Sequence, residues 1–285
     1  MDGNWLPGIT PSREVPAGID TSVAHSARVY DYILGGKDNF EADRKAAEAA
    51  LAAQPHLATA MRENRALMRR MVAFLAAEAG VRQFLDIGTG LPTSPNVHEI
   101  AGAEHPGARV VYVDNDPIVL AHARALLTCG GDGATAYIDA DAREPGRILA
   151  DPRLRGTLDL SEPVALLLFG ILHFIPDAAD PYGIVATLLA ALPPGSYLAI
   201  QHPTADFYPE GGGAATAYGN AGIPFRYRTR DEFSRFLDGL DLVPPGITLM
   251  AEWRPAAGSD PRPAPEQAAG WAAIARKAAL PAGDG

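Results

Sequence analysis

The sequence predicts an α/β protein with a doubly wound, seven-stranded, mostly parallel sheet and a helical segment ahead of that sheet. Two observations support this fold class. Short apolar runs alternate with helical stretches between residues 83 and 202, which is typical of a parallel sheet with helices on both faces. The region 229–277 instead adds a helix and two strand candidates, 242–251 and 270–276, which we expect to form a hairpin at one edge.

The parallel strands are predicted from five apolar runs, at 83–88, 108–114, 134–140, 163–171 and 196–202. Helices are expected between them, at 94–103, 117–128, 143–150 and 181–192. Ahead of the sheet, apolar residues recur at three- and four-residue spacing from Leu57 to Ala79, which predicts a long helix. Asn64 falls on that apolar stripe, where a polar side chain needs a partner in the protein or in a ligand. A shorter helix is expected to start at a capping box of Asp38 and Glu41.

Composition limits the class of protein and its partners. The 285 residues carry 34 acidic and 24 basic side chains, a net charge of −10, which disfavours nucleic acid as a partner. A single cysteine, Cys129, excludes an internal disulfide and fits a reducing compartment. No apolar run has the length of a membrane span and no signal pattern opens the chain, so we expect a cytoplasmic protein without membrane contact. The oligomeric state is not indicated.

The loop after the first strand reads Asp86-Ile87-Gly88-Thr89-Gly90. Glycines allow close approach of the backbone to a ligand and leave amide groups available at a helix start. The third glycine of the dinucleotide fingerprint is replaced by Thr93, so the full G-x-G-x-x-G pattern is absent. Taken alone, this loop fits an ordinary tight turn as well as a ligand site.

The second and third predicted strands also end in acids. Asp116 with Pro117 is a good helix start, so its role is explained by capping. Asp114 is not needed for that cap, and a carboxylate there can accept both hydroxyls of a ribose. After the third strand, in the stretch Asp139-Ala140-Asp141-Ala142, an acid can accept from an adenine amine. Together with the glycine loop, these residues predict an adenosine site.

Three adenosine cofactors differ in the residues that they require from a protein. A nicotinamide dinucleotide is disfavoured by the missing third glycine, and no Tyr-x-x-x-Lys pair occurs. ATP is disfavoured because the chain lacks a P-loop, and Lys37 of the Gly35-Gly36-Lys37 stretch is followed by an aspartate. S-adenosylmethionine carries no phosphate, and it requires an acid for the ribose and polar groups for its amino-acid part. The residues match that set.

The stretches "FLDIGTGLPT", "VVYVDNDPIVLAHARALL", "YIDADAREP" and "LLLFGILHFIPD" resemble the successive motifs of a bacterial S-adenosylmethionine-dependent methyltransferase family, formerly a domain of unknown function. The resemblance extends to "RVYDYILGGKDNFEADR" and "RENRALMRR" and covers Ile19 to Arg276. It implies a Rossmann-like class I methyltransferase domain over 81–280, behind a helical lid over 19–80 and a flexible tail over 1–18. The resemblance implies cofactor contacts from Asp86, Gly88 and Gly90 at the methionine part, Asp114 at the ribose, Asp141 near the adenine, and Asn115, Ala142 and Gly170 in the same loops.

The N-terminal motif is interpreted as a lid over the cofactor, since methyl transfer at a sulfonium is hindered by water. The lid residues expected near the ligand are the aromatic Tyr30, Tyr32 and Phe40, the turn glycines Gly35 and Gly36, and the polar Lys37 and Asn39. Lys37 is expected to pair with the cofactor carboxylate. The alternative is a helical segment that only packs on the sheet, with its tyrosines in the core.

Histidines are the candidate bases, because their pKa lies near neutral pH. His173 and His202 follow the fourth and fifth strands, although a structural role fits them as well, and the other histidines, His25 among them, are expected in solvent. No metal site is predicted. We expect methyl transfer to a small molecule, natural product or peptide, with the accepting atom unspecified. A non-catalytic S-adenosylmethionine sensor and an NAD(P)-dependent oxidoreductase remain as alternatives.

Overall fold

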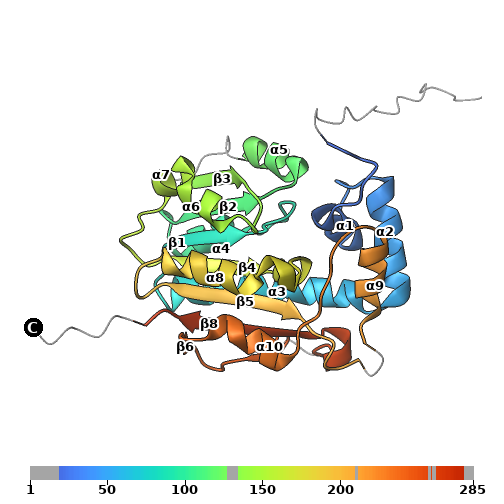
Figure 1. Ribbon diagram of the computed structural model, residues 1–285. Helices are drawn as coiled ribbons and strands as arrows, with labels where there is room; N and C mark the ends of the chain where they lie inside the picture. The colour runs from blue at the N-terminus through green and yellow to red at the C-terminus, as the bar shows by residue number, and fades with distance from the viewer. Residues whose placement is uncertain (1–18, 127–133, 209–210, 256–257, 259–260, 279–285) are drawn as a thin grey trace, which may run out of the picture.

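The computed structural model describes residues 19–126, 134–208, 211–255, 258 and 261–278, so the predicted tail over 1–18 and Cys129 lie outside the described residues. A central sheet is covered by helices, and three further helices lie beyond the carboxyl ends of its parallel strands (Figure 1). No helix in the described ranges combines the length and the apolarity that crossing a membrane requires.

The five predicted parallel strands are confirmed, with small differences at their ends. They are β1 (Gln83–Ile87), β2 (Arg109–Asp114), β3 (Thr135–Asp139), β4 (Ala165–Phe169) and β5 (Tyr197–Pro203). Their order is β3-β2-β1-β4-β5, and every neighbouring pair is parallel. The winding reverses between β1 and β4, which opens a crevice at the carboxyl ends of these strands.

The predicted antiparallel strand pair at one edge of the sheet is confirmed, but its outer strand is divided into two. β8 (Gly270–Arg276) lies inside the sheet, antiparallel to both β5 and β6 (Asp241–Leu242), and it also pairs with β7 (Thr248–Leu249). The expected strand over 242–251 is therefore split into two short strands. Pro244 and Pro245 lie at the break, and proline lacks the N–H that a continuous ladder requires. Among the described residues the sheet has eight strands, because the outer strand of the predicted seven is divided into two.

Helices connect the strands as predicted, with additions that the sequence pattern did not indicate. The helices that follow the start of the sheet are α4 (Val97–Glu104), α5 (Pro117–Leu126), α6 (Pro145–Ala150), α7 (Pro152–Thr157), α8 (Pro181–Ala190), α9 (Gly213–Asn220) and α10 (Arg230–Ser234). Single 3-10 turns form η1 (Leu172–Phe174), η2 (Asp177–Ala179), η3 (Arg235–Leu237) and η4 (Pro265–Gln267). The helices α7 and α9 were not predicted.

The sheet separates two hydrophobic cores. Leu85 and Ile87 of β1 face a core that α8 completes, whereas Phe84 faces the opposite core. The long helix α3 (Leu57–Ala77) covers that second face with side chains such as Met71 and Leu75, which confirms the predicted apolar stripe. Burial on both faces explains why the parallel strands read as continuous apolar runs.

A third core lies outside the sheet, within what we call the helical cap: α1 (Ser26–Ile33), α2 (Glu41–Ala53) and α9. Val29, Ala47 and Tyr218 pack there against Met61 from the first half of α3. Because α3 belongs to both the cap and the sheet core, packing is continuous across the predicted division at residue 80, and that division stays a prediction.

The start of α2 differs from the expected capping box. The backbone N–H of Phe40, the residue before the helix, donates to Asp43 Oδ2 at 2.8 Å. Asp43 therefore takes the place that was expected for Glu41. Asp38 instead contacts His122 Nε2 at 3.2 Å. The capping pair is thus shifted by two residues from the predicted one, and the amide of Asp38 donates to Asp31 Oδ2 at 2.8 Å ahead of the helix.

Candidate functional site

A cavity of about 610 Å³ lies between the carboxyl ends of the parallel strands and the helical cap. The loops after β1, β2, β3 and β4 line one side of it, and α1, α3 and the segment 222–224 line the other. Figure 1 shows the cap helices directly beyond the strand ends. The crevice that the strand order creates is therefore covered by α1 and α3, which precede the sheet in the sequence, and by the segment 222–224, which follows β5.

Asp86 lies near the end of β1 and lines this cavity, with 8% of its surface exposed. Thr89 Oγ1 donates to Asp86 Oδ2 at 2.9 Å. Burial raises the pKa of Asp86 to about 6, and the Thr89 hydroxyl and the charge of Arg65 only partly oppose that rise. The cavity thus contains a carboxylate that is poorly neutralised by the protein itself.

The glycine loop brings the first, second and fourth strand ends together. Gly88 and Gly90 have φ of 73° and 66°, values that favour glycine. A Cβ on Gly88 would lie 2.6 Å from Ile171 Cγ1, so a larger residue cannot fit without displacing the loop after β4. The amide of Gly90 donates to Asp114 Oδ2 at 2.8 Å. Gly170 also lines the cavity, with φ of 68°.

The other two predicted carboxylates line the same cavity but differ in their surroundings. Asp114 is 7% exposed and accepts from the amides of Gly90 and Asp116, and burial raises its pKa. Asp141 is held by Arg143, whose Nε donates to Asp141 Oδ1 at 2.9 Å, and this bond lowers its pKa. Asn115 Nδ2 donates to Asp141 Oδ2 at 3.3 Å. Asn115 and Ala142 complete the lining of this part.

The lid residues divide into two groups. Tyr30, Gly35 and Gly36 line the cavity. Gly36 is required because a Cβ there would lie 1.9 Å from an Asp31 carboxylate oxygen. Four predicted contacts are not brought to the cavity. The Tyr32 hydroxyl donates to Glu48, and Asn39 Nδ2 donates to Asp31 and to the Gly36 carbonyl. The Phe40 ring lies beside Arg28, with its centroid 5.6 Å from the guanidinium carbon, and Lys37 is exposed.

His202 does not have the character of a base. It is 1% exposed, its Nε2 lies 2.8 Å from Arg228 Nη1, and its Nδ1 lies 2.7 Å from the Pro203 carbonyl oxygen. Because arginine only donates, Nε2 accepts, and the ring proton is on Nδ1. Burial and the Arg228 charge lower the pKa of His202 to about 3. Both ring nitrogens are therefore engaged in a neutral, structural histidine.

His173 is likewise buried and does not belong to the cavity lining. Its ring packs against Phe174 and Phe225, with centroid distances of 3.9 and 4.6 Å. Burial, and then the charges of His202 and Arg228, hold its pKa well below the usual range. The structure thus does not bring either predicted histidine to the carboxylates of the cavity.

Residues that sequence reasoning did not assign to the site are contributed by α3 and by the start of α1. Asn64 and Arg65 line the cavity, and neither Asn64 Oδ1 nor Arg65 Nε has a hydrogen-bond partner among the described residues. The polar Asn64 on an apolar stripe was the one signal available. His25, expected in solvent, also lines the cavity, with its Nδ1 at 2.9 Å from Asp116 Oδ2.

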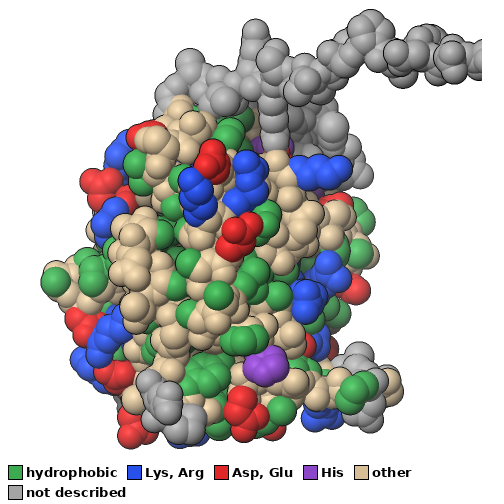
Figure 2. All heavy atoms as spheres, turned by 90° about the vertical axis from the view of Figure 1, so that its right-hand side faces the viewer, with side chains coloured by type: hydrophobic (Ala, Val, Ile, Leu, Met, Phe, Trp, Pro, Cys, Tyr) green, Lys and Arg blue, Asp and Glu red, His purple; other side chains and the backbone are tan. Residues whose placement is uncertain are grey.

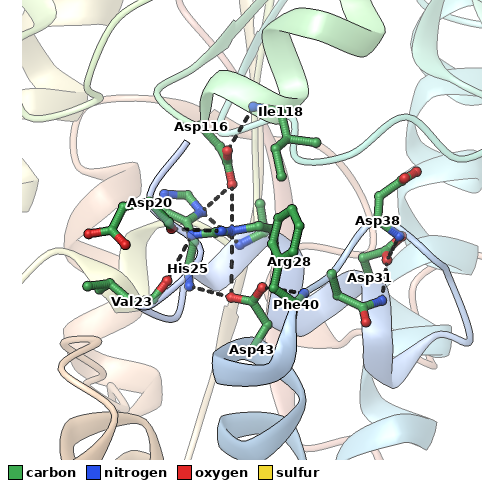
Figure 3. A network of polar contacts seen from close by, with 12 residues as sticks. Asp20, Val23, His25, Arg28, Asp31, Asp38, Phe40, Asp43, Asp116 and Ile118 are labelled. Carbon is green, nitrogen blue, oxygen red and sulfur yellow. Dashed lines mark hydrogen bonds and ion pairs between the residues drawn. The ribbon is translucent and has the colours of Figure 1, made fainter. Parts of the chain in front are cut away.

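Beside the cavity lies a buried charge network between the cap and the sheet (Figure 3). Arg28 Nε of α1 lies 3.3 Å from Asp116 Oδ2 and 3.6 Å from Asp43 Oδ1. Asp43 also accepts from the amides of His25 and Phe40, and Asp116 Oδ1 accepts from the amide of Ile118, which confirms the predicted cap of α5. In the described ranges, no group of three His, Cys, Asp or Glu side chains is placed to hold a metal ion.

Comparisons with known proteins agree with the sequence motifs. Residues 12–278 match the model of a family described as S-adenosyl methyltransferase. A DUF574 family protein from Streptomyces avermitilis is 51% identical, with a TM-score of 0.88 over 90% of this chain and 99% of that one. A protein from Thermobifida fusca with a provisional methyltransferase name is 43% identical, with a TM-score of 0.86 over 95% of this chain and 100% of that one. No curated protein matches significantly.

Proposed function

The chain belongs to the S-adenosyl methyltransferase family, whose cofactor is S-adenosylmethionine, and from this premise we propose that it methylates a small molecule or natural product. The fold agrees with the class I methyltransferases that the sequence motifs resemble, since the parallel strands follow the order β3-β2-β1-β4-β5 with an antiparallel strand beside β5. The methyl acceptor and the reacting atom are the parts of the function that require a proposal.

The observation that carries the proposal is the meeting of Asp86, Asp114 and Asp141 at one cavity. Three carboxylates would repel a phosphate-bearing ligand but suit a nucleoside that carries a positive charge. We assign the ribose to Asp114, the methionine part to Asp86, Gly88 and Gly90, and the adenine to the Asp141 side. Because Arg143 already holds Asp141, adenine recognition there would use the shared carboxylate and the backbone beside Ala142.

The acceptor side of the cavity supports a small, largely apolar substrate. Apolar side chains line it where the strand loops meet the cap: Phe169, Ile171, Phe174, Ile175, Ile223 and Pro224. The volume of about 610 Å³ is within the range of small-molecule sites. On the face that carries the cap, basic and acidic side chains are interspersed rather than gathered by sign (Figure 2), unlike the basic stripe expected of a nucleic-acid binder.

The bound cofactor supplies an activated methyl group on a sulfonium. The residues of this chain bind it, cover it with α1 and exclude water from the reacting atoms. The acceptor must also lose a proton, and neither His173 nor His202 is placed to accept it. We therefore propose catalysis by positioning, with the methylated acceptor losing its proton to solvent or buffer after the products leave the cavity.

The function is tested by incubating the protein with S-adenosylmethionine labelled in its methyl group and with fractionated small-molecule extracts. Label is expected in an apolar extract fraction. Asp114→Ala should reduce transfer at limiting cofactor, because it removes the ribose acceptor and weakens cofactor binding by about 1–3 kcal/mol. Calorimetry with S-adenosylhomocysteine measures that loss directly. Tight binding without transfer to any fraction would favour a sensor over an enzyme, and unchanged affinity in Asp114→Ala would contradict the ribose assignment.

A further inference from the structure

Asn64 of α3 lies where the part of the cavity assigned to the cofactor meets its apolar side. A Cβ on Gly170, the first residue after β4, would lie 3.1 Å from Asn64 Nδ2. The next residue, Ile171, contacts the glycine loop, because a Cβ on Gly88 would lie 2.6 Å from its Cγ1. Asn64 lines the cavity, and only 8% of its surface is exposed. Its amide group is therefore beside both the loop assigned to the methionine part and the side assigned to the methyl acceptor.

A neighbouring tyrosine fixes the orientation of the Asn64 amide. The Tyr30 hydroxyl donates its single hydrogen to the Met61 carbonyl oxygen at 2.9 Å, so towards Asn64 it can only accept. The atom that faces it at 3.5 Å is accordingly Nδ2. Asn64 Oδ1 is left buried, without a hydrogen-bond partner among the described residues. A buried carbonyl oxygen without a donor is unfavourable, which indicates that a ligand supplies one.

The apolar side of the cavity offers this oxygen no side-chain donor, because Phe169, Ile171, Phe174 and Ile175 carry none. We propose that Asn64 Oδ1 accepts a hydrogen bond from the methyl acceptor, which is then an apolar molecule with an O–H or N–H at the atom that is methylated. This inference rests on the proposed function, because it names the substrate class of that reaction.

The same contact distinguishes the acceptor from its methylated product. The accepting atom gains the methyl group from the cofactor sulfur and releases its hydrogen as a proton. An acceptor with one hydrogen there, such as a phenol or a secondary amine, can no longer donate once it is methylated. Asn64 Oδ1 is then unpaired again, which weakens binding of the product and favours its release. Thioethers, tertiary amines and ionised carboxylates lack the donor and fall outside this substrate class.

The experiment uses p-cresol and p-xylene, which differ only in that a hydroxyl of the first replaces a methyl group of the second. Their affinities for the protein saturated with S-adenosylhomocysteine are measured by ligand-observed NMR titration. Asn64→Leu should weaken p-cresol by about 3- to 10-fold, as expected for one neutral hydrogen bond, and leave p-xylene unchanged or tighter. Asn64→Asp, which keeps an oxygen acceptor, should lose less p-cresol affinity than Asn64→Leu. Calorimetry should show nearly unchanged affinity for S-adenosylhomocysteine in Asn64→Leu.

Arg62→Leu is the matched control, because Arg62 is exposed on the same helix and lies outside the cavity lining. It should leave all three affinities unchanged. Equal effects of Asn64→Leu on p-cresol and p-xylene, or a wild-type protein that does not bind p-cresol, would overturn the inference alone. A loss confined to S-adenosylhomocysteine would assign Asn64 to the cofactor and overturn it as well. A wild-type protein that does not bind S-adenosylhomocysteine would overturn the proposed function too.

Discussion

The molecule buries carboxylates in two adjacent regions and surrounds them differently. Under the helical cap, Asp43 and Asp116 face Arg28 and His25 and accept from backbone amides. Burial alone would raise the pKa of Asp116, but its contacts with His25 and Arg28 and the Ile118 amide lower it. At the cavity, Asp86 has no such partner, and burial raises its pKa to about 6.

The charges under the cap stabilise the fold, whereas the carboxylate at the cavity is placed to bind a ligand. A buried ion pair whose members neutralise each other is complete in the empty protein, whereas a carboxylate with a raised pKa costs stability until a cation arrives. The motif "RVYDYILGGKDNFEADR" contributes to both regions. Arg28 and Asp43 belong to the structural network, and Tyr30, Gly35 and Gly36 line the cavity.

The largest effect is expected from breaking the structural region. Arg28→Met should lower the free energy of unfolding by about 3–5 kcal/mol, because it leaves Asp43 and Asp116 buried without their cation. Urea unfolding of the ligand-free protein measures this loss. Lys45→Met is the control, since the pair of Lys45 with Glu41 is exposed, is screened by water, and should leave the free energy of unfolding nearly unchanged. A loss below about 1 kcal/mol for Arg28→Met would show that the network is not needed.

Replacing a buried aspartate by asparagine should change the free energy of unfolding in opposite directions in the two regions. Asp86→Asn should raise the free energy of unfolding at pH 7 by up to about 3 kcal/mol, the equivalent of the shift in its pKa, because it removes a poorly neutralised charge and keeps an acceptor for Thr89. Asp43→Asn should lower the free energy of unfolding, since it removes half of a neutralised pair. If both variants shift stability in one direction, the proposed contrast is wrong.

The smallest expected effect is the pH dependence of stability and of the affinity for S-adenosylhomocysteine. In the empty protein the raised pKa of Asp86 means that the folded state holds a proton more tightly than the unfolded chain, so stability falls as pH rises from about 4 to about 6. Binding of an ammonium group requires the ionised form. The affinity for S-adenosylhomocysteine should therefore be constant above pH 6 and fall below it, by at most tenfold per pH unit for one proton.

The charged and titratable groups around Asp86 are Arg65 on α3, Asp114 and Tyr112 on β2, and Tyr137 on β3. Burial raises the pKa values of Tyr112 and Tyr137 well above the usual range of a tyrosine. Both side chains therefore stay protonated below pH 8 and do not contribute to the pH dependence of binding. Calorimetry between pH 5 and pH 8 on the wild type and on Asp86→Asn isolates the effect. An identical pH dependence in the variant would assign it instead to Asp114 or to His25, which also lines the cavity and whose pKa its contact with Asp116 raises.

Many of the residues that line the cavity could be predicted from the amino-acid sequence. Alternation of apolar runs with helical stretches predicts parallel strands, and parallel strands bring their carboxyl ends to the same edge. Asp86, Asp114 and Asp141 follow from that rule alone, because each lies at the end of its own strand. The glycine loop follows for the same reason, since its turn conformation is a local property of the chain.

The remaining features depend on contacts between segments that lie far apart in the sequence. Whether His202 accepts a proton depends on Arg228, 26 residues later, and whether Arg65 has a counter-ion depends on the loop around Thr93. The place of β8 inside the sheet depends on β5, which precedes it by a long connection. Local periodicity determines which face of an element is buried, but the charge and hydrogen-bonding state of a side chain is set by its neighbours in space. For that reason the order of the strands and the acids at their ends could be predicted, and the pairing of the buried charges could not.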